Sequence, residues 1–159
     1  MPRHTVANAI SFSKALDRSI HTMEKKWIKR NQKLVTQSMR RLIAKTPVHT
    51  GRTVRSYMAS NGTAKHTNKS EGNPVEATNK LPLGAEQLRG RAAAEALATL
   101  SSVNFSDPYD VFFITNNSPA VAGLEVGALP AEPYTPRSPQ GMFGVTLQEI
   151  TALADLGIL

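Results

Sequence analysis

The sequence predicts a small α+β fold, in which a long N-terminal helix and a second helix pack on a small, mostly antiparallel sheet with extended loop arms. Two stretches with helical spacing of apolar residues and two short runs of strand-forming residues support this expectation. The 159 residues suffice for a single domain with one modest core and are too few for two.

The first predicted element is a long amphipathic helix over about residues 11–45. Ser11 or Ser13 can cap its start, and Pro47 stops it because a residue before proline avoids helical backbone angles. The helix would be about 50 Å long, so part of it must project or meet another chain. The apolar residues that define its stripe are Phe12, Leu16, Ile20, Met23, Trp27, Leu34, Val35, Met39, Leu42 and Ile43. Asn31 interrupts this stripe and marks a place for a kink.

Two runs are predicted to form strands. Residues 52–60 alternate in a β-type pattern and end at Asn61-Gly62, a turn signal. Residues 109–115 (YDVFFIT) are rich in β-branched and aromatic side chains, which favours a central strand.

The remaining segments are assigned by composition. The segment from about residue 83 to residue 101 is rich in Ala, Leu, Glu and Arg, which predicts the second helix. Residues 61–82 have almost nothing to bury and are expected to form a mobile loop. Residues 116–141 are expected to form a Pro-rich loop, and 142–159 a short amphipathic C-terminal segment.

Composition excludes several functions. The chain has no cysteine, so disulfides, thiolate metal sites and cysteine nucleophiles are ruled out, and a reducing cytoplasm suits its synthesis. The four histidines lack the spacing of a metal site, and no carboxylate pair, serine elbow or phosphate-binding loop is present. We therefore expect no catalytic activity, no cofactor and no metal. We also expect no membrane contact, because no apolar run approaches the length of a signal peptide or a spanning helix.

Charge is divided unevenly along the chain. Residues 1–69 hold 15 Lys and Arg against 2 acids, a net +13, whereas residues 70–159 hold 4 against 10, a net −6. This split indicates either a basic surface for nucleic acid or an acidic partner, or copies that meet head to tail. The candidate charged interface comprises Lys25, Lys26, Lys29, Arg30, Lys33, Arg40 and Arg41. A solvated helix face is the alternative reading of the same residues.

A compact corner follows the first helix, with the sequence Thr46, Pro47, Val48, His49, Thr50, Gly51. Thr46 and Thr50 can hydrogen-bond backbone groups freed beside Pro47, and Gly51 can take the positive φ that turns a helix toward a sheet. We interpret Gly127 and Gly141 in the same architectural way. Glu125 is expected either to pair with the basic first half or to lie solvated at a rim.

Three separated segments, TPVHTGRTVRSY, VFFITNNSPAVAGLEVG and PQGMFGVTLQEI, resemble the neck or tail-completion family of tailed bacteriophages, the head-to-tail joining proteins. They occur in the family's order, and the resemblance covers roughly residues 10–150. The chain departs from the pattern at His49, where Asp is usual, at Pro119-Ala120-Val121 in place of Pro-Tyr-Ala, and at Val126 in place of an aromatic residue.

The resemblance implies a non-enzymatic virion protein that forms a six- or twelve-fold ring at the head-tail junction. Its implied partners are further copies of itself, portal or adaptor proteins on the head side, and the tail terminator or tail tube on the other. Genome DNA would pass through the ring without sequence-specific binding. Two alternatives remain: a tail-terminator or tail-tube subunit, and a DNA-binding packaging accessory that uses the basic face of residues 25–33.

Overall fold

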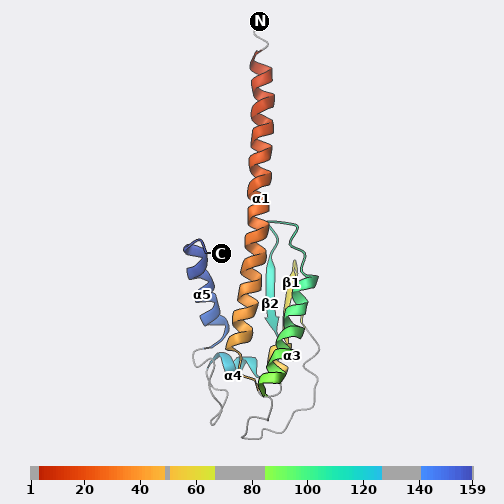
Figure 1. Cartoon of the computed structure of the whole chain (residues 1–159), viewed down its shortest axis with the longest axis vertical. Helices are drawn as coiled ribbons and strands as arrows, with labels where there is room; N and C mark the ends of the chain where they lie inside the picture. The colour runs from red at the N-terminus through yellow and green to blue at the C-terminus, as the bar shows by residue number, and fades with distance from the viewer. Residues whose placement is uncertain (1–3, 49–50, 67–84, 127–140, 159) are drawn as a thin grey trace.

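The computed structural model describes residues 4–48, 51–66, 85–126 and 141–158. Over these ranges the chain is a mostly helical α+β structure with a long N-terminal helix and a small antiparallel sheet, which confirms the predicted fold class (Figure 1). In chain order the elements are α1 (His4–Lys45), α2 (Arg52–Arg55), β1 (Tyr57–Asn61), α3 (Ala85–Ala98), the 3-10 turn η1 (Thr99–Ser102), β2 (Phe112–Asn116), α4 (Val121–Glu125) and α5 (Phe143–Asp155).

Helix α1 begins earlier than predicted, at His4, so neither Ser11 nor Ser13 is its cap. The Ser11 hydroxyl donates instead to the carbonyl of Asn8 within the helix. The helix is unbroken at Asn31, whose side-chain amide donates to the carbonyl of Pro108 at 3.0 Å. The polar residue in the stripe therefore marks a tertiary contact, and the N-terminal half of α1 projects beyond the rest of the molecule (Figure 1).

The sheet consists of β1 and β2, paired antiparallel from Tyr57 opposite Asn116 to Asn61 opposite Phe112. The prediction of a strand from residue 52 was wrong, because residues 52–55 form α2. Gly51, with φ of 75°, leads directly into this helical turn, and the Ser56 hydroxyl closes it by donating to the carbonyl of Arg52. The second strand is shifted from the predicted 109–115 to Phe112–Asn116.

The two predicted loops lie only partly within the residues that the structure describes. Asn61 belongs to β1, residues 62–66 have no regular structure, and the rest of the 61–82 segment lies outside the described residues. The prediction that 116–141 is entirely loop was wrong at α4, while residues 127–140 lie outside the described ranges. The C-terminal segment forms the 13-residue helix α5.

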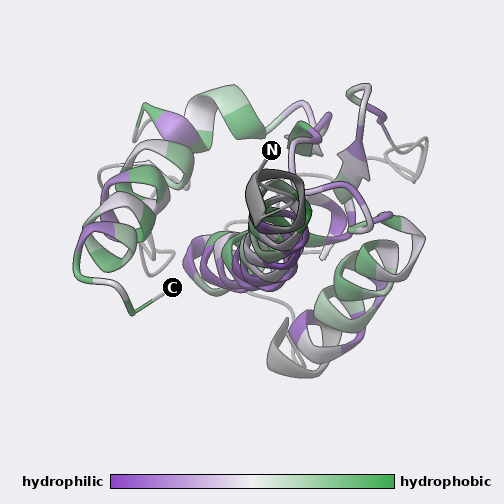
Figure 2. Ribbon diagram, turned by 90° about the horizontal axis from the view of Figure 1, so that it is seen from above, coloured by the Kyte–Doolittle hydropathy of each residue, from purple (hydrophilic) through white to green (hydrophobic). Residues whose placement is uncertain are grey.

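The core forms around the C-terminal half of α1. Viewed from above, α1 lies between α3 and α5, which flank it on different sides (Figure 2). On α3 the buried side chains are the small ones of Ala92 and Ala96, which allow α3 to pack closely against the core. The buried apolar residues are Val35, Met39, Leu42, Ile43, Val48, Val54, Tyr57, Ala59, Ala92, Ala96, Val103, Leu124 and Met142. Among the described residues, no helix combines the length and apolarity needed to cross a bilayer.

Candidate assembly site

Thr46 stands at the centre of the corner that follows α1, and its side chain is fully buried. Its hydroxyl donates to the carbonyl of Leu42 at 2.7 Å and lies 2.9 Å from the hydroxyl of Tyr57. Because the single hydroxyl hydrogen of Thr46 goes to Leu42, Tyr57 is the donor in the second bond. The sulfur of Met142 lies 3.2 Å from the Thr46 oxygen and 3.7 Å from the Tyr57 oxygen.

The carbonyl groups at the C-terminal end of α1 accept hydrogen bonds from Arg89 of α3. One guanidinium nitrogen of Arg89 donates to the carbonyls of Ile43 and Thr46, both at 3.1 Å. The end of a helix leaves carbonyls without intrahelical partners and favours a positive charge, so Arg89 meets both needs. The corner is thereby tied to α3 as well as to β1.

The other corner residues have structural positions. Val48 is buried in the core, and Gly51 has the positive φ expected of it. His49 and Thr50 lie outside the described residues. Gly51 therefore agrees with its expected part. The hydroxyl of Thr46 bonds the carbonyl of Leu42, which already accepts the N–H of Thr46, whereas the carbonyl of Ile43 that Pro47 leaves free is bound by Arg89. The part assigned to Thr50 stays a prediction.

Tyr57 was not singled out from the sequence, although it ends the segment TPVHTGRTVRSY. Its side chain is fully buried, with its ring 6.0 Å from that of Phe143. Burial raises the pKa of Tyr57 to about 12, even though the hydrogen bond to Thr46 acts in the opposite direction. Tyr57 thus serves as a neutral anchor between the corner and the start of α5.

Glu125 occupies neither of the two positions expected for it. Its carboxylate accepts the backbone N–H groups of Met142, Phe143 and Gly144 at 2.8–2.9 Å, at the N-terminus of α5. Burial acts to raise the pKa of Glu125, but these three backbone bonds outweigh it and hold the pKa below the ordinary value of 4.5. An acid from a distant segment therefore caps α5, where the helix dipole favours negative charge.

Gly141 is required by the same contact. Its φ is +90°, and a Cβ added there would lie 2.6 Å from the carbonyl oxygen of Glu125. Only glycine fits both the backbone angle and the space. Gly127, predicted to act similarly, lies outside the described residues.

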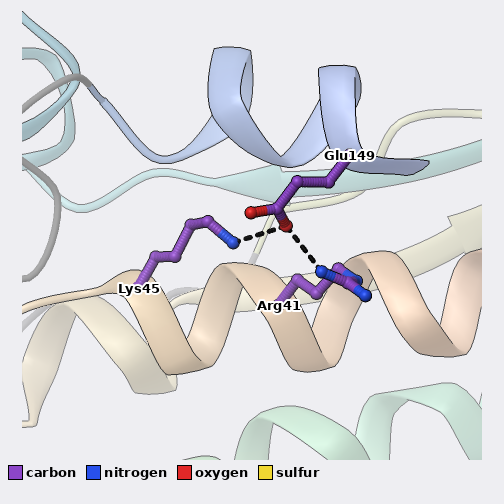
Figure 3. A network of polar contacts seen from close by, with 3 residues as sticks. All are labelled: Arg41, Lys45 and Glu149. Carbon is purple, nitrogen blue, oxygen red and sulfur yellow. Dashed lines mark hydrogen bonds and ion pairs between the residues drawn. The ribbon is translucent and has the colours of Figure 1, made fainter. Parts of the chain in front are cut away.

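Some of the basic residues proposed as an interface make contacts within the same molecule. Arg41 and Lys45 each place a nitrogen 2.7 Å from the same carboxylate oxygen of Glu149 on α5 (Figure 3). The hydrogen bond from Lys45 is the largest of several contributions that lower the pKa of Glu149, and they outweigh its partial burial. One oxygen of α5 thus bridges two cations of α1.

Two further cations of α1 bind the far end of α5. Lys33 donates to the carbonyl of Ile158 at 2.8 Å, and Arg30 to that of Ala154 at 3.4 Å. These are positions where a helix favours positive charge. The candidate cations with exposed side chains that are not in these contacts are Lys25, Lys26, Lys29 and Arg40.

These contacts define a mostly helical α+β protein whose buried polar groups join elements far apart in sequence. In the part of the chain that the structure describes, no three His, Cys, Asp or Glu side chains gather as metal ligands would. The comparisons with family models, curated proteins and solved structures found no match.

Proposed function

We propose that this chain is a non-enzymatic structural subunit of a tailed-phage virion. It forms a ring at the head-tail junction, joins the capsid connector to the tail, and leaves an axial channel for the genome. Its work is mechanical, and its neighbours are further copies of itself, a portal or adaptor protein, and the tail terminator or tube.

One observation supports this proposal above all others: the three segments that carry the family resemblance meet in space. Thr46 and Tyr57 come from the first segment, Glu125 from the second, and Gly141 and Met142 from the third. Thr46 and Tyr57 contact Met142, while Glu125 binds the backbone of Met142 and packs against Gly141. Motif residues that meet at one place are what an architectural unit of such a family would require.

The exposed charges suit a contact between neighbouring subunits. Lys25, Lys26, Lys29 and Arg40 remain exposed on α1, and acids such as Asp107 and Asp155 are exposed on the second half of the chain. A ring needs two different complementary surfaces on each subunit, because a head-to-tail contact that closes is heterologous. Exposed basic and acidic side chains of this kind can supply such surfaces.

The test is the number of copies per virion, measured by quantitative mass spectrometry against the major capsid protein. We expect about six or twelve copies, as a single symmetric ring requires. Hundreds of copies would identify a tube subunit instead. Absence from the virion would contradict a structural role.

A complementation experiment tests the joining step itself. Particles made without this chain should accumulate as DNA-filled heads beside separate tails, and adding the purified chain should produce joined particles, counted by electron microscopy. Joined, infectious particles in its absence would contradict the proposal.

The second candidate is a DNA-binding accessory, favoured by the exposed Lys25, Lys26 and Lys29 on α1. Phosphate contacts by such a cluster give affinity that falls steeply with salt. Filter binding of the isolated chain to duplex DNA, compared with a K25E/K26E/K29E variant, separates the candidates. Tight binding that the variant loses would favour the accessory role over the ring.

A further inference from the structure

The projecting half of α1 carries an apolar seam on its surface, formed by Phe12, Leu16, Ile20, Met23 and Trp27. These side chains are 39–70% exposed. Within the described residues the ring of Tyr109, 5.5 Å from that of Trp27, touches one end of the seam. A continuous apolar row of this kind on a folded chain marks an interaction surface.

The spacing of the seam fits a second helix as its partner. Steps of four, four, three and four residues average 3.75, close to the 3.6 residues of a helical turn, so the side chains stay on one face of α1. Further along α1, Arg30, Arg41 and Lys45 lie on this same face at 100° per residue, and there α5 covers it. The seam is therefore the uncovered continuation of a face that already packs against a helix.

The seam is complementary to itself when reversed. If two copies of α1 run antiparallel about Ile20, Phe12 of one copy lies opposite Trp27 of the other. Leu16 then lies opposite Met23, and Ile20 lies close to its own counterpart. A near-palindromic row of this kind suits a twofold, self-complementary contact.

Helix α5 decides between the two directions. In a parallel pair, the C-terminal halves of both α1 helices would approach along the face that α5 occupies, and paired helices lie only about 8–10 Å apart. In an antiparallel pair the projecting halves overlap, and only residues 4–9 of one copy reach positions 30–35 of the other, where Arg30 and Lys33 bind the end of α5. The antiparallel arrangement therefore covers the seam with far less overlap on α5 than the parallel one.

We propose that two copies of this chain pair through an antiparallel contact between their projecting α1 segments, centred on Ile20. This inference does not rest on the joining role. A twofold pair cannot be the contact within a ring whose subunits all point the same way, so it describes the free chain before assembly.

The pair forms against like charge. The projecting segment carries Lys14, Arg18, Lys25 and Lys26 against Asp17 and Glu24, so each copy brings a net positive charge, and pairing also places Asp17 of one copy near Glu24 of the other. The apolar seam must outweigh this repulsion, which salt screens. The pair should therefore tighten several-fold between about 50 and 300 mM salt. Weakening by salt would contradict a contact through the seam.

Single cysteines introduced into this cysteine-free chain test the register. Ile20→Cys should form a disulfide between two copies under mild oxidation. Leu16→Cys alone should not, because the two Leu16 positions lie about 10 Å apart along the axis, beyond the Cα separation that a disulfide bridges. Mixing Leu16→Cys with Met23→Cys should restore the crosslink. Crosslinking of Leu16→Cys with itself would mean a parallel pair and overturn the proposal.

Sedimentation of the full chain tests the pair without cysteines. At micromolar concentration we expect a mass twice the 17.2 kDa of one chain. Leu16→Glu should weaken the association at least tenfold, whereas Leu147→Glu, at an exposed leucine of α5 away from the seam, should not. Because both side chains are exposed, folding should persist in both variants. A single-chain mass for the parent, or equal effects of the two variants, would overturn the proposal.

Discussion

The carboxylate of Glu125 and the backbone of Gly141 meet at the first turn of α5, and each depends on the other. Glu125 binds the three N–H groups that start the helix, and Gly141 gives its carbonyl the space it needs. A side chain at 141 would strain the backbone and push Glu125 away at once. The start of α5 therefore depends on one acid and one glycine that are 16 positions apart.

We expect Gly141→Ala to lower the free energy of unfolding by at least about 2 kcal/mol, since it combines a left-handed backbone with a steric overlap. The matched control is Gly90→Ala on α3, where an added Cβ meets nothing within 4 Å. That change should raise stability by up to about 1 kcal/mol, because alanine favours helix. Urea unfolding of the two variants gives the comparison. Equal effects would contradict the role assigned to Gly141.

The titration of Tyr57 should lower the free energy of unfolding at alkaline pH. Its pKa is raised from 10.0 to about 12 in the folded chain, so the folded state holds its proton where the unfolded state loses it. The associated stability is fully present below pH 10 and is lost as pH rises toward 12. The loss should be about 2–3 kcal/mol, on the scale of 1.4 kcal/mol for each pKa unit.

The measurement is urea unfolding from pH 9 to 12 for the parent chain and Tyr57→Phe. The phenylalanine variant keeps the ring but has no group to titrate at this position, so the difference between the two curves isolates Tyr57 from the lysines. The parent should lose more stability than the variant across this range. Parallel curves would contradict the buried, neutral state of the hydroxyl.

Among the elements, α5 contacts α1 through charged groups and helix ends in addition to its partly buried apolar side chains. Glu149 accepts from Arg41 and Lys45, while Lys33 and Arg30 bind carbonyls at the other end of α5. Thr146 is the one residue between Phe143 and Asp155 that is fully buried. With few fully buried side chains, α5 also relies on these polar contacts for its position.

Neighbouring arginines provide a matched pair of variants. Arg41→Glu should release α5, because it removes one partner of Glu149 and places a like charge beside it. Arg40→Glu changes charge equally at an exposed position. We expect about 1 kcal/mol of destabilisation and faster amide hydrogen exchange in α5 for Arg41→Glu alone.

The control for this prediction is the charge swap Arg41→Glu with Glu149→Arg, which should restore part of the protection in α5, because the pair with position 41 is re-formed while the new arginine lies beside Lys45. Arg40→Glu also separates folding from assembly, since it should leave the fold intact and weaken only contacts with neighbours. If Arg40→Glu loosened α5 as much as Arg41→Glu does, the assigned ion pair would not be what positions this helix.

For the whole molecule, the division of charge predicts how a ring responds to salt. If exposed cations of α1 meet acids of the next subunit, ring assembly should weaken as ionic strength rises, because exposed pairs are screened. Assembly is measured by electron microscopy or sedimentation between 50 and 500 mM salt. Insensitivity over this range would contradict a charged contact. The twofold pair proposed above should respond in the opposite direction, so salt separates the two contacts.

Local patterns predicted much of the fold. The spacing of apolar residues identified α1, and Pro47 predicted its end, because both signals act within a few residues. The positive φ of Gly51 followed from the turn that the corner requires. The prediction failed at residues 52–55, because Val54 and Met58 fit a helical turn followed by a strand as well as a strand alone, and the structure has the turn, closed by the bond from Ser56 to the carbonyl of Arg52.

The sequence by itself thus determined the fold class, the long helix, its stop and the glycine that turns the chain. Only the tertiary structure decided that Glu125 caps α5, that Tyr57 binds Thr46, and that Arg41 pairs with Glu149. These partners lie 11 to 108 positions apart along the chain. Hydrogen bonds and ion pairs depend on distances of a few ångströms, and such distances are set by how the elements pack, which no local pattern of residues specifies.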